Sequence, residues 1–383
     1  MLPIPILNVI AAFIFASLIT WLIIPRIVRI TKHKRLTDKP GDRKIHKYEI
    51  PTLGGIGIFI GFFISLLLFV NGNIEHITII AAASVIIFLM GAKDDLVNMD
   101  APKKLLIEFS VALLIALASD IRFTSFHGFL GIDTVPVWIS ILITVFLIVV
   151  IMNSFNLIDG IDGLAASTGI LCSVVYAIWF WMAGAIGYTV MAMAIAGALT
   201  AFLPFNIYRG RFKIFMGDAG SLTIGLLLAI LTIKFNELNA HQAAPFSFQS
   251  APAIAIGILF LPLFDTLRVT VIRISQGSHP FQGDNNHIHH RLLRLGLTHK
   301  QATLLLVFVN SLFIGLAVLL DNLGIITSGI ILLAAAMLLS NFTFWLEKKR
   351  TSEKTGNIAD NSKEIYFLNQ SILKSNLLTK QRA

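Results

Sequence analysis

The amino-acid sequence predicts an all-α, polytopic integral membrane protein with about eleven transmembrane helices. Of its 383 residues, 56% are hydrophobic and only 13% are charged, and the mean hydropathy is +0.81. A soluble domain carries roughly 25% charged residues, and a transmembrane helix needs about 20 consecutive apolar residues. Apolar runs of that length recur along the whole chain, whereas the alternating segments of about ten residues that build a membrane barrel do not occur.

The expected spans follow one another from the N-terminus and are joined by polar connections. Each is a run of roughly 17 to 25 residues that ends where charged residues, glycine or proline interrupt the apolar pattern. The eleven predicted spans are residues 4–25, 53–71, 76–93, 103–119, 135–153, 163–183, 186–206, 220–236, 251–272, 301–320 and 323–346. We expect them to form one transmembrane domain, residues 1–346, followed by a polar tail, residues 347–383.

The Lys and Arg residues predict which side of the membrane each connection faces. The first apolar run is followed rather than preceded by basic residues, which places the N-terminus outside and argues against a cleavable signal peptide. The tail is then cytoplasmic, and every Lys and Arg except Arg122 and Lys234 falls in a cytoplasmic connection. Orientation and contact with anionic lipid headgroups therefore explain the net charge of +9, without nucleic acid as a partner.

Polar clusters stand at the cytoplasmic ends of these spans, where charge is costly and usually marks function. Asp94 and Asp95 end the third span. Adjacent carboxylates repel each other unless a cation lies nearby, so this pair is a candidate for catalysis. The alternative is that the pair caps the end of a helix. Because all the clusters share one side, loops distant in the sequence can converge on a single site facing the cytosol.

The segment between the fifth and sixth spans is the most specific of these clusters. Asn156, Asp159 and Asp162 recur every three residues, so one helical turn presents three oxygen ligands on about one face. Gly160 and Gly163 allow close approach of the backbone. Since residues 153–162 contain no Lys or Arg, their charge calls for an external cation or a ligand rich in hydrogen-bond donors. Mg²⁺ prefers hard oxygen ligands of this kind.

A further acidic site precedes the eighth span, in the sequence Phe215-Met-Gly217-Asp218-Ala-Gly220. Small residues and backbone N–H groups at the start of a helix suit phosphate or a metal-bound anion. By itself, Asp218 could be an ordinary helix cap. In the company of the other acidic clusters, we predict that it is a metal ligand.

The last internal connection carries His287, His289 and His290 beside Arg291. Histidines at this spacing could bind zinc. No cysteine lies nearby and the acids elsewhere suit Mg²⁺ better. We therefore favour a cationic clamp for a diphosphate, to which Arg273 adds a charge.

The first cytoplasmic connection ends in Lys47-Tyr-Glu-Ile-Pro51-Thr52-Leu-Gly54-Gly55. We expect Lys47 and Thr52 to add phosphate contacts from this side of the site. The alternative for Lys47 is a solvated basic face with no ligand.

Taken in order along residues 1–346, these motifs resemble those of the polyprenyl-phosphate N-acetylhexosamine-1-phosphate transferases, the WecA/TagO type within the MraY superfamily. The matching stretches are Pro51-Thr-Leu-Gly-Gly55, Asp94-Asp95, Asn153-Ser-Phe-Asn-Leu-Ile-Asp-Gly-Ile-Asp-Gly163, Phe215-Met-Gly-Asp-Ala-Gly-Ser221 and His287-Ile-His-His290. The histidine sequence is similar to the N-acetylhexosamine branch, because the muramoyl-pentapeptide branch has a His-His-His-Phe-Glu type of loop. Ser154 stands where alanine is more usual.

The resemblance implies transfer of N-acetylglucosamine 1-phosphate from UDP-N-acetylglucosamine to undecaprenyl phosphate in the bacterial cytoplasmic membrane, with release of UMP. It implies Mg²⁺, with Mn²⁺ as a substitute, held by Asp218 and Asn156. It also implies that Asp94 and Asp95 bind or deprotonate the lipid phosphate, and we group Asp159 with them as a catalytic candidate.

A nucleotide subsite and a diphosphate subsite are implied as well. Asp162 would hydrogen-bond the uracil, and Phe215 would stack on it. The residues expected to hold the diphosphate are Lys47, His287, His289 and His290. A homodimer is a further expectation.

Two other classes of membrane protein also place acids near apolar spans. A transporter built from inverted halves would show internal repeats and a polar path to both faces, and the sequence shows neither. A CDP-alcohol phosphotransferase would need an Asp-Gly-x-x-Ala-Arg type of sequence, which Asp162-Gly163-Leu-Ala-Ala166 does not continue. Within the favoured class, another UDP-N-acetylhexosamine, such as UDP-N-acetylgalactosamine, is the alternative donor.

Overall fold

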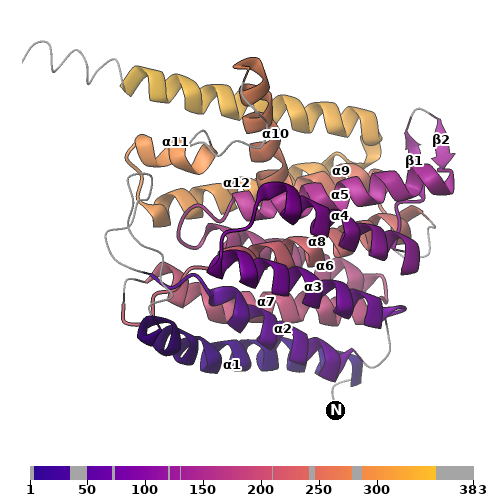
Figure 1. Cartoon of the computed structure of the whole chain (residues 1–383). Coiled ribbons are helices and arrows are strands. Elements are labelled where there is room, and N and C mark those ends of the chain that lie inside the picture. The colour runs from indigo at the N-terminus through magenta and orange to yellow at the C-terminus, as the bar shows by residue number, and fades with distance from the viewer. Residues whose placement is uncertain are drawn as a thin grey trace, which may run out of the picture.

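Long apolar helices make up most of the described chain (Figure 1). The computed structural model describes residues 4–34, 50–70, 74–119, 121–129, 131–208, 210–240, 246–277 and 287–350. The predicted phosphate contact Lys47 and the polar tail from residue 351 onward lie outside the described residues.

Each predicted span coincides with a helix or, in one case, with a pair of helices. The first eight are α1 (Ile4–His33), α2 (Gly54–Phe69), α3 (Ile77–Leu96), α4 (Ala101–Ala118), α5 (Val137–Leu157), α6 (Leu164–Met182), α7 (Ile186–Ile207) and α8 (Gly217–Ala240). They are followed by α9 (Ala251–Ile258), α10 (Phe260–Ser275), α11 (Ile288–Arg294), α12 (His299–Leu319), the short 3-10 helix η1 (Asp321–Leu323) and a final helix, Ile325–Arg350.

Length and composition identify the helices that can cross a membrane. Within the described ranges, eight helices are long and apolar enough, or up to nine if the bent pair α9–α10 is one span. Helix α2 is apolar but has only 16 residues, and α4 carries Lys103, Lys104 and Glu108 within its 18 residues. The all-α, multi-pass fold is thus confirmed, while the number eleven and the orientation stay predictions.

Helix α8 forms the centre of the bundle. Of the residues in its most apolar 18-residue stretch, 89% are buried, whereas the same share is 17% for α1 and for the final helix. Helices α2, α3, α5, α6 and α9 all pack against it. Because Asp218 lies at its first turn, this residue is held at the end of the best-buried helix in the described chain.

The predicted span 251–272 is broken rather than continuous. Helix α9 ends at Ile258, and α10 begins at Phe260 with its axis turned by 82°. Figure 1 shows α10 standing across the direction of the other helices. The amide side chain of Asn310 on α12 meets the groups freed by the break: it donates to the Ile258 carbonyl at 3.1 Å and accepts from the Leu261 amide at 2.9 Å.

A two-stranded antiparallel hairpin interrupts the otherwise helical chain. Its strands are β1 (Ser125–Phe129) and β2 (Ile132–Thr134), and it lies at the opposite end of the bundle from α11 (Figure 1). Glu237 near the end of α8 anchors the approach to β1, because its carboxylate accepts from the Thr124 amide at 2.7 Å and the Thr124 hydroxyl at 2.6 Å. Strands this short give no periodic signal in the sequence.

Candidate active site

A short backbone ladder joins the start of α2 to the segment that precedes α8. The Gly54 amide donates to the Phe215 carbonyl at 2.9 Å, and the Gly55 amide donates to the Met216 carbonyl at 2.7 Å. In return, the Phe215 amide donates to the Pro51 carbonyl at 2.8 Å. Two motifs about 160 residues apart in the sequence are thereby fixed side by side through main-chain atoms.

Glycine allows the helices to approach the start of α8 at backbone distance. A Cβ atom at Gly91 of α3 would lie 2.6 Å from the Cα atom of Ala219. Gly217 has φ +72°, and a Cβ there would lie 2.2 Å from the carbonyl oxygen of Thr52. Only glycine adopts that backbone conformation at low cost. The predicted phosphate contact Thr52 therefore adjoins the turn that carries Asp218.

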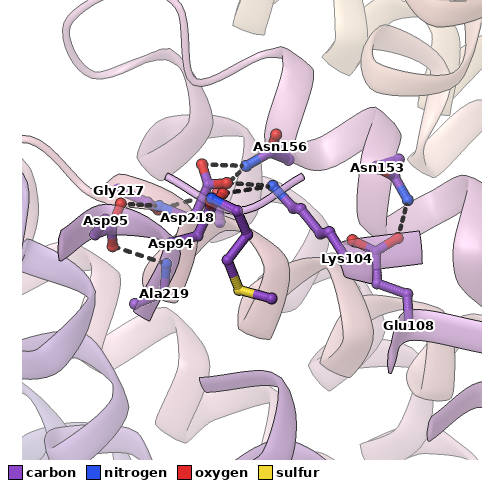
Figure 2. A network of polar contacts seen from close by, with 11 residues as sticks. Asp94, Asp95, Lys104, Glu108, Asn153, Asn156, Gly217, Asp218 and Ala219 are labelled. Carbon is purple, nitrogen blue, oxygen red and sulfur yellow. Dashed lines mark hydrogen bonds and ion pairs between the residues drawn. The ribbon is translucent and has the colours of Figure 1, made fainter. Parts of the chain in front are cut away.

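The carboxylate of Asp218 is held from two sides (Figure 2). The ammonium of Lys104 on α4 contacts Asp218 Oδ2 and also lies 3.2 Å from Asp94 Oδ2. The side-chain nitrogen of Asn156 donates to Asp218 Oδ1 at 2.9 Å and to the Ser221 hydroxyl at 2.8 Å. The structure thus brings together the predicted metal ligands and Asp94, and it adds Lys104 between them.

The neighbouring acids Asp94 and Asp95 make different contacts. Asp95 accepts hydrogen bonds from the backbone amides of Asp218 at 2.8 Å and Ala219 at 3.1 Å. It therefore caps the start of α8 from across the bundle, where helix amides are free and the dipole favours negative charge. Asp94 accepts from the Met99 amide at 2.6 Å, and its other oxygen faces Lys104.

Asp159 lies beside this cluster in the turn that follows α5. Burial raises the pKa of its carboxyl well above the ordinary value, and the charges of Asp218, Asp95 and Asp162 raise it further. Like charges gathered in a partly dry site favour the neutral form of one member. The cluster is therefore short of positive charge, even with Lys104 in place.

The polar network continues one helical turn deeper along α4. Glu108 is completely buried and accepts from the side-chain nitrogen of Asn153 at 2.5 Å (Figure 2). Its other oxygen has no hydrogen-bond partner in the described part of the chain. The Glu108–Asn153 contact joins α4 to α5. Both of these helices also contact α8 at Asp218, α4 through Lys104 and α5 through Asn156.

The two residues predicted for the uracil meet at a lysine. The Lys213 ammonium lies 2.7 Å from Asp162 Oδ1 and 5.7 Å from the centroid of the Phe215 ring. His299 of α12 lies 3.5 Å from the other Asp162 oxygen. Burial alone would raise the pKa of Asp162, but His299 and Lys213 outweigh it and hold that pKa below the ordinary value. Asp162 is therefore an ionised acceptor.

The three predicted histidines form a stack that reaches the Asn/Asp segment. The ring of His289 is 1% exposed, and its Nε2 atom would lie 2.3 Å from a Cβ added at Gly160. Its ring centroid is 5.6 Å from that of His287 and 4.4 Å from that of His290. Burial lowers the pKa of His289 to about 3. Burial thus keeps the His289 ring neutral in this structure, and its place in the diphosphate clamp stays a prediction.

The predicted arginines lie on two different helices, Arg291 on α11 and Arg273 on α10. Arg291 points to the final helix, where its Nε atom is 3.1 Å from Glu347 and its Nη1 donates to the Ser340 carbonyl at 3.2 Å. Arg273 is buried on α10. Binding of a diphosphate by these two side chains stays a prediction, and Arg291 would have to leave Glu347 to take part.

The donor set suits Mg²⁺ better than zinc. The described residues contain no group of three or more His, Cys, Asp or Glu side chains arranged to hold a metal ion. Mg²⁺ usually takes only one or two protein carboxylates and completes its shell with water and substrate phosphates. Asp218 offers such a carboxylate, and no donor among the described residues contacts the side-chain oxygen of Asn156. The Lys104 ammonium already stands at a position that favours a cation.

Comparison with known proteins agrees with these motifs. Residues 77–236 match the family model for glycosyl transferase family 4. Over 317 residues, the chain is 30% identical to the probable undecaprenyl-phosphate N-acetylglucosaminyl 1-phosphate transferase of Bacillus subtilis (strain 168). The match covers 82% of this chain and 86% of that relative. The chain belongs to glycosyl transferase family 4. The family segment begins at α3 and ends within α8, so it contains the whole carboxylate network.

Two further members of the family extend the match beyond that segment. The chain is 28% identical over 323 residues to the undecaprenyl-phosphate alpha-N-acetylglucosaminyl 1-phosphate transferase of Yersinia pestis, covering 84% of this chain and 86% of the relative. It is 27% identical over 317 residues to the protein of the same description from Escherichia coli (strain K12), and the match covers 82% of this chain and 83% of that relative. The family resemblance predicted from the motifs is confirmed, and the transporter alternative is set aside.

The polar residues of the site that were not predicted from the sequence include Lys104, Glu108, Lys213, His299 and Asp265. Lys104 was counted only among the charges that set orientation, and Lys213 and His299 carry no motif of their own. Asp265, described below, lies inside the apolar run of α10. An acid inside an apolar run is the same signal that identified the other clusters, so Asp265 could have been found in that way.

Proposed function

We propose that the protein transfers N-acetylglucosamine 1-phosphate from UDP-N-acetylglucosamine to undecaprenyl phosphate. The products are undecaprenyl-diphosphate-N-acetylglucosamine and UMP, the first membrane step of a cell-envelope polysaccharide. The descriptions of the relatives in Bacillus subtilis, Yersinia pestis and Escherichia coli support this reaction. The observation that carries the proposal is the cluster at the start of α8, in which Asp94 and Asp218 share the Lys104 ammonium and Asn156 donates to Asp218.

The reaction exchanges one phosphoanhydride bond for another. An oxygen of the undecaprenyl phosphate attacks the phosphorus atom that carries the sugar. The new P–O bond forms as the bond from that phosphorus to the bridging oxygen breaks, and the bridging oxygen leaves with UMP. We favour this direct attack because a phosphate oxygen is already a competent nucleophile, and neither oxidation nor reduction is involved.

The chain's own residues prepare the anionic groups before a substrate arrives. Asp95 fixes the first amides of α8, while Lys104 and Asn156 orient the carboxylate of Asp218. A group that is already oriented needs no rearrangement during reaction. Asp94, which ends α3, is proposed to serve the lipid phosphate, with Asp159 as a further catalytic candidate beside it.

A divalent cation completes the proposed chemistry. Mg²⁺, or Mn²⁺ in its place, would bind at Asp218 and Asn156 and neutralise the charge of the diphosphate. The excess of carboxylates at the site supports this, because a buried cluster of like charges favours cation binding. We further propose that the site faces the cytoplasm of a bacterial cell, as the distribution of Lys and Arg favours.

Release of UMP by purified protein tests the proposal. Wild-type protein in detergent would be supplied with UDP-N-acetylglucosamine, undecaprenyl phosphate and Mg²⁺. We expect UMP to form only when all three are present, and Asp218→Ala to abolish turnover while the protein stays folded in the membrane. Near-normal turnover of Asp218→Ala at saturating Mg²⁺ would contradict the metal assignment.

The identity of the sugar needs its own comparison. UDP-N-acetylgalactosamine differs from the proposed donor in the direction of one hydroxyl, and a site that hydrogen-bonds this hydroxyl discriminates strongly. The kcat/KM values of the two donors with the same acceptor decide the point. A preference for the galactosamine donor would overturn the sugar assignment and leave phosphosugar transfer intact.

A further inference from the structure

A buried carboxylate on α10 holds the first residue of the histidine motif. Asp265 is 1% exposed. Its Oδ2 atom lies 2.9 Å from His287 Nδ1, and its Oδ1 atom accepts the Ile288 amide at 2.9 Å. Arg268, one turn further along α10, lies 3.3 Å from Oδ1 and balances part of the charge. One carboxylate therefore fixes both the ring of His287 and the first amide of α11.

This geometry selects which ring nitrogen of His287 is available. A carboxylate beside Nδ1 favours a proton on that nitrogen, since the N–H can then donate to it. The other nitrogen, Nε2, has no hydrogen-bond partner among the described residues. It is consequently the nitrogen of His287 that can meet a ligand.

The broken helix is what brings Asp265 to this position. A straight continuation of α9 would carry residue 265 along the bundle axis, whereas the 82° turn leads α10 across it. The Asn310 amide secures the turn by bonding to Ile258 and Leu261 on either side of it. The direction of α10, and with it the position of Asp265, is thus set by a side chain on α12.

The ring held by Asp265 connects to the Asn/Asp segment. His287 stacks on His289 with an angle of 12° between the ring planes. His289 in turn lies against Gly160, which stands between the candidate site residues Asp159 and Asp162 in the sequence. A carboxylate on α10 is therefore linked to the predicted substrate-binding turn through two imidazole rings.

We propose that Asp265 is a positioning residue that fixes the direction of the His287 ring and stabilises its doubly protonated form, so that Nδ1–H donates to Asp265 and Nε2–H donates to a phosphate oxygen of the nucleotide-sugar diphosphate. This inference rests on the proposed function, because it assigns the ligand of His287 from that reaction. Asp265 itself touches no substrate and acts only through the ring. Replacing a carboxylate that orients a metal-binding histidine typically costs about 10–100-fold in metal affinity or activity, and we expect a loss of the same order here.

A double-mutant cycle tests whether Asp265 acts through His287. UMP release would be measured for wild type, Asp265→Asn, His287→Gln and the double variant. We expect each single change to lower kcat/KM for the UDP-sugar by about 10–100-fold, and the double variant to be no worse than the poorer single one. Multiplied losses in the double variant would show independent roles and overturn the proposal. Asp321→Asn is the matched control. Asp321 accepts a hydrogen bond from the Ser250 amide at 2.7 Å, and this contact lies away from the site, so the variant should leave kcat/KM unchanged.

A measurement on the unmodified ring covers the case in which Asp265→Asn does not fold. Protein labelled with ¹⁵N-histidine reports by NMR which ring nitrogens carry a proton, and the signal lost in His287→Gln identifies His287. We expect both ring nitrogens of His287 to carry a proton. A ring that lacks a proton on either nitrogen would overturn the proposal even if the enzyme is active. Conversely, a doubly protonated ring in a wild-type protein that releases no UMP would keep the positioning geometry and reject the proposed function.

Discussion

The contact between α3 and α8 makes Gly91→Ala the sharpest perturbation of the site. The added Cβ would lie 2.6 Å from the Cα and amide nitrogen of Ala219 and 2.7 Å from the carbonyl carbon of Asp218. Carbon atoms pack at about 3.5–4.0 Å, so the two backbones must separate by roughly 1 Å. No side chain can move aside, because every one of these contacts is with main-chain atoms.

Two effects of this separation can be measured. Overpacking of a well-packed interior costs about 1–3 kcal/mol, which lowers the melting temperature of the purified protein. A displacement of about 1 Å at reacting groups can cost on the order of 10²-fold in rate, because Asp218 moves relative to Asp94 and Lys104. UMP release per folded protein gives the rate, and size-exclusion chromatography gives the folded fraction.

A matched glycine supplies the control. Gly315 lies within α12, and a Cβ there would meet nothing within 4 Å. Gly315→Ala should keep full turnover and lose no stability, since alanine is the better helix former by about 1 kcal/mol. If Gly91→Ala retains the turnover and melting temperature of the wild type, the argument that backbone contact positions Asp218 is wrong.

Three further predictions concern single side chains. Asp95→Ala should lower the free energy of unfolding by about 0.5–2 kcal/mol, as expected when a helix loses its cap, and an unchanged denaturation midpoint would contradict the cap. Asn310→Ala should cost about 1–3 kcal/mol, because the Leu261 amide loses its partner and the Ile258 carbonyl keeps only the Cys172 thiol as a donor; equal thermal stability would mean that the bend does not depend on Asn310. His289 binds a proton near pH 6.5 when unfolded but only near pH 3 when folded, so stability should fall as the pH drops through this window, by up to about 1.4 kcal/mol per unit. His289→Gln should flatten that dependence, and an identical pH profile for both proteins would refute the neutral buried ring.

The apolar spans were predictable because each depends on a local property of the chain. A run of about 20 apolar residues identifies a membrane helix wherever it lies in the fold. The break in 251–272 was not predictable in the same way, since Asn310 stabilises it from about 50 residues away. Residues 251–272 read as one apolar run, and a contact supplied by another helix decides where it bends.

The contacts of the candidate site likewise fall into those that the sequence predicts and those that only the tertiary fold decides. The convergence of Asp94, Asn156 and Asp218 was foreseen from their common side of the membrane, and their contacts agree with it. The contacts of Lys104 and Arg291 were not foreseen, because a long basic side chain reaches whichever carboxylate the fold brings near. Arg291 pairs with Glu347 on the final helix, and no local sequence pattern indicates this pairing.

The ladder between the start of α2 and the approach to α8 has a consequence for how this site can change. A junction built of main-chain atoms has no rotamers to redistribute, so α2, α3 and the first turn of α8 must travel as one body if Asp218 is to move. Adjustment to a different donor or acceptor then falls to the surrounding side chains that do have alternatives, such as Lys213 and His299. Changes in specificity between related proteins should accordingly occur among those surrounding side chains, while the glycines at the junction tolerate no replacement.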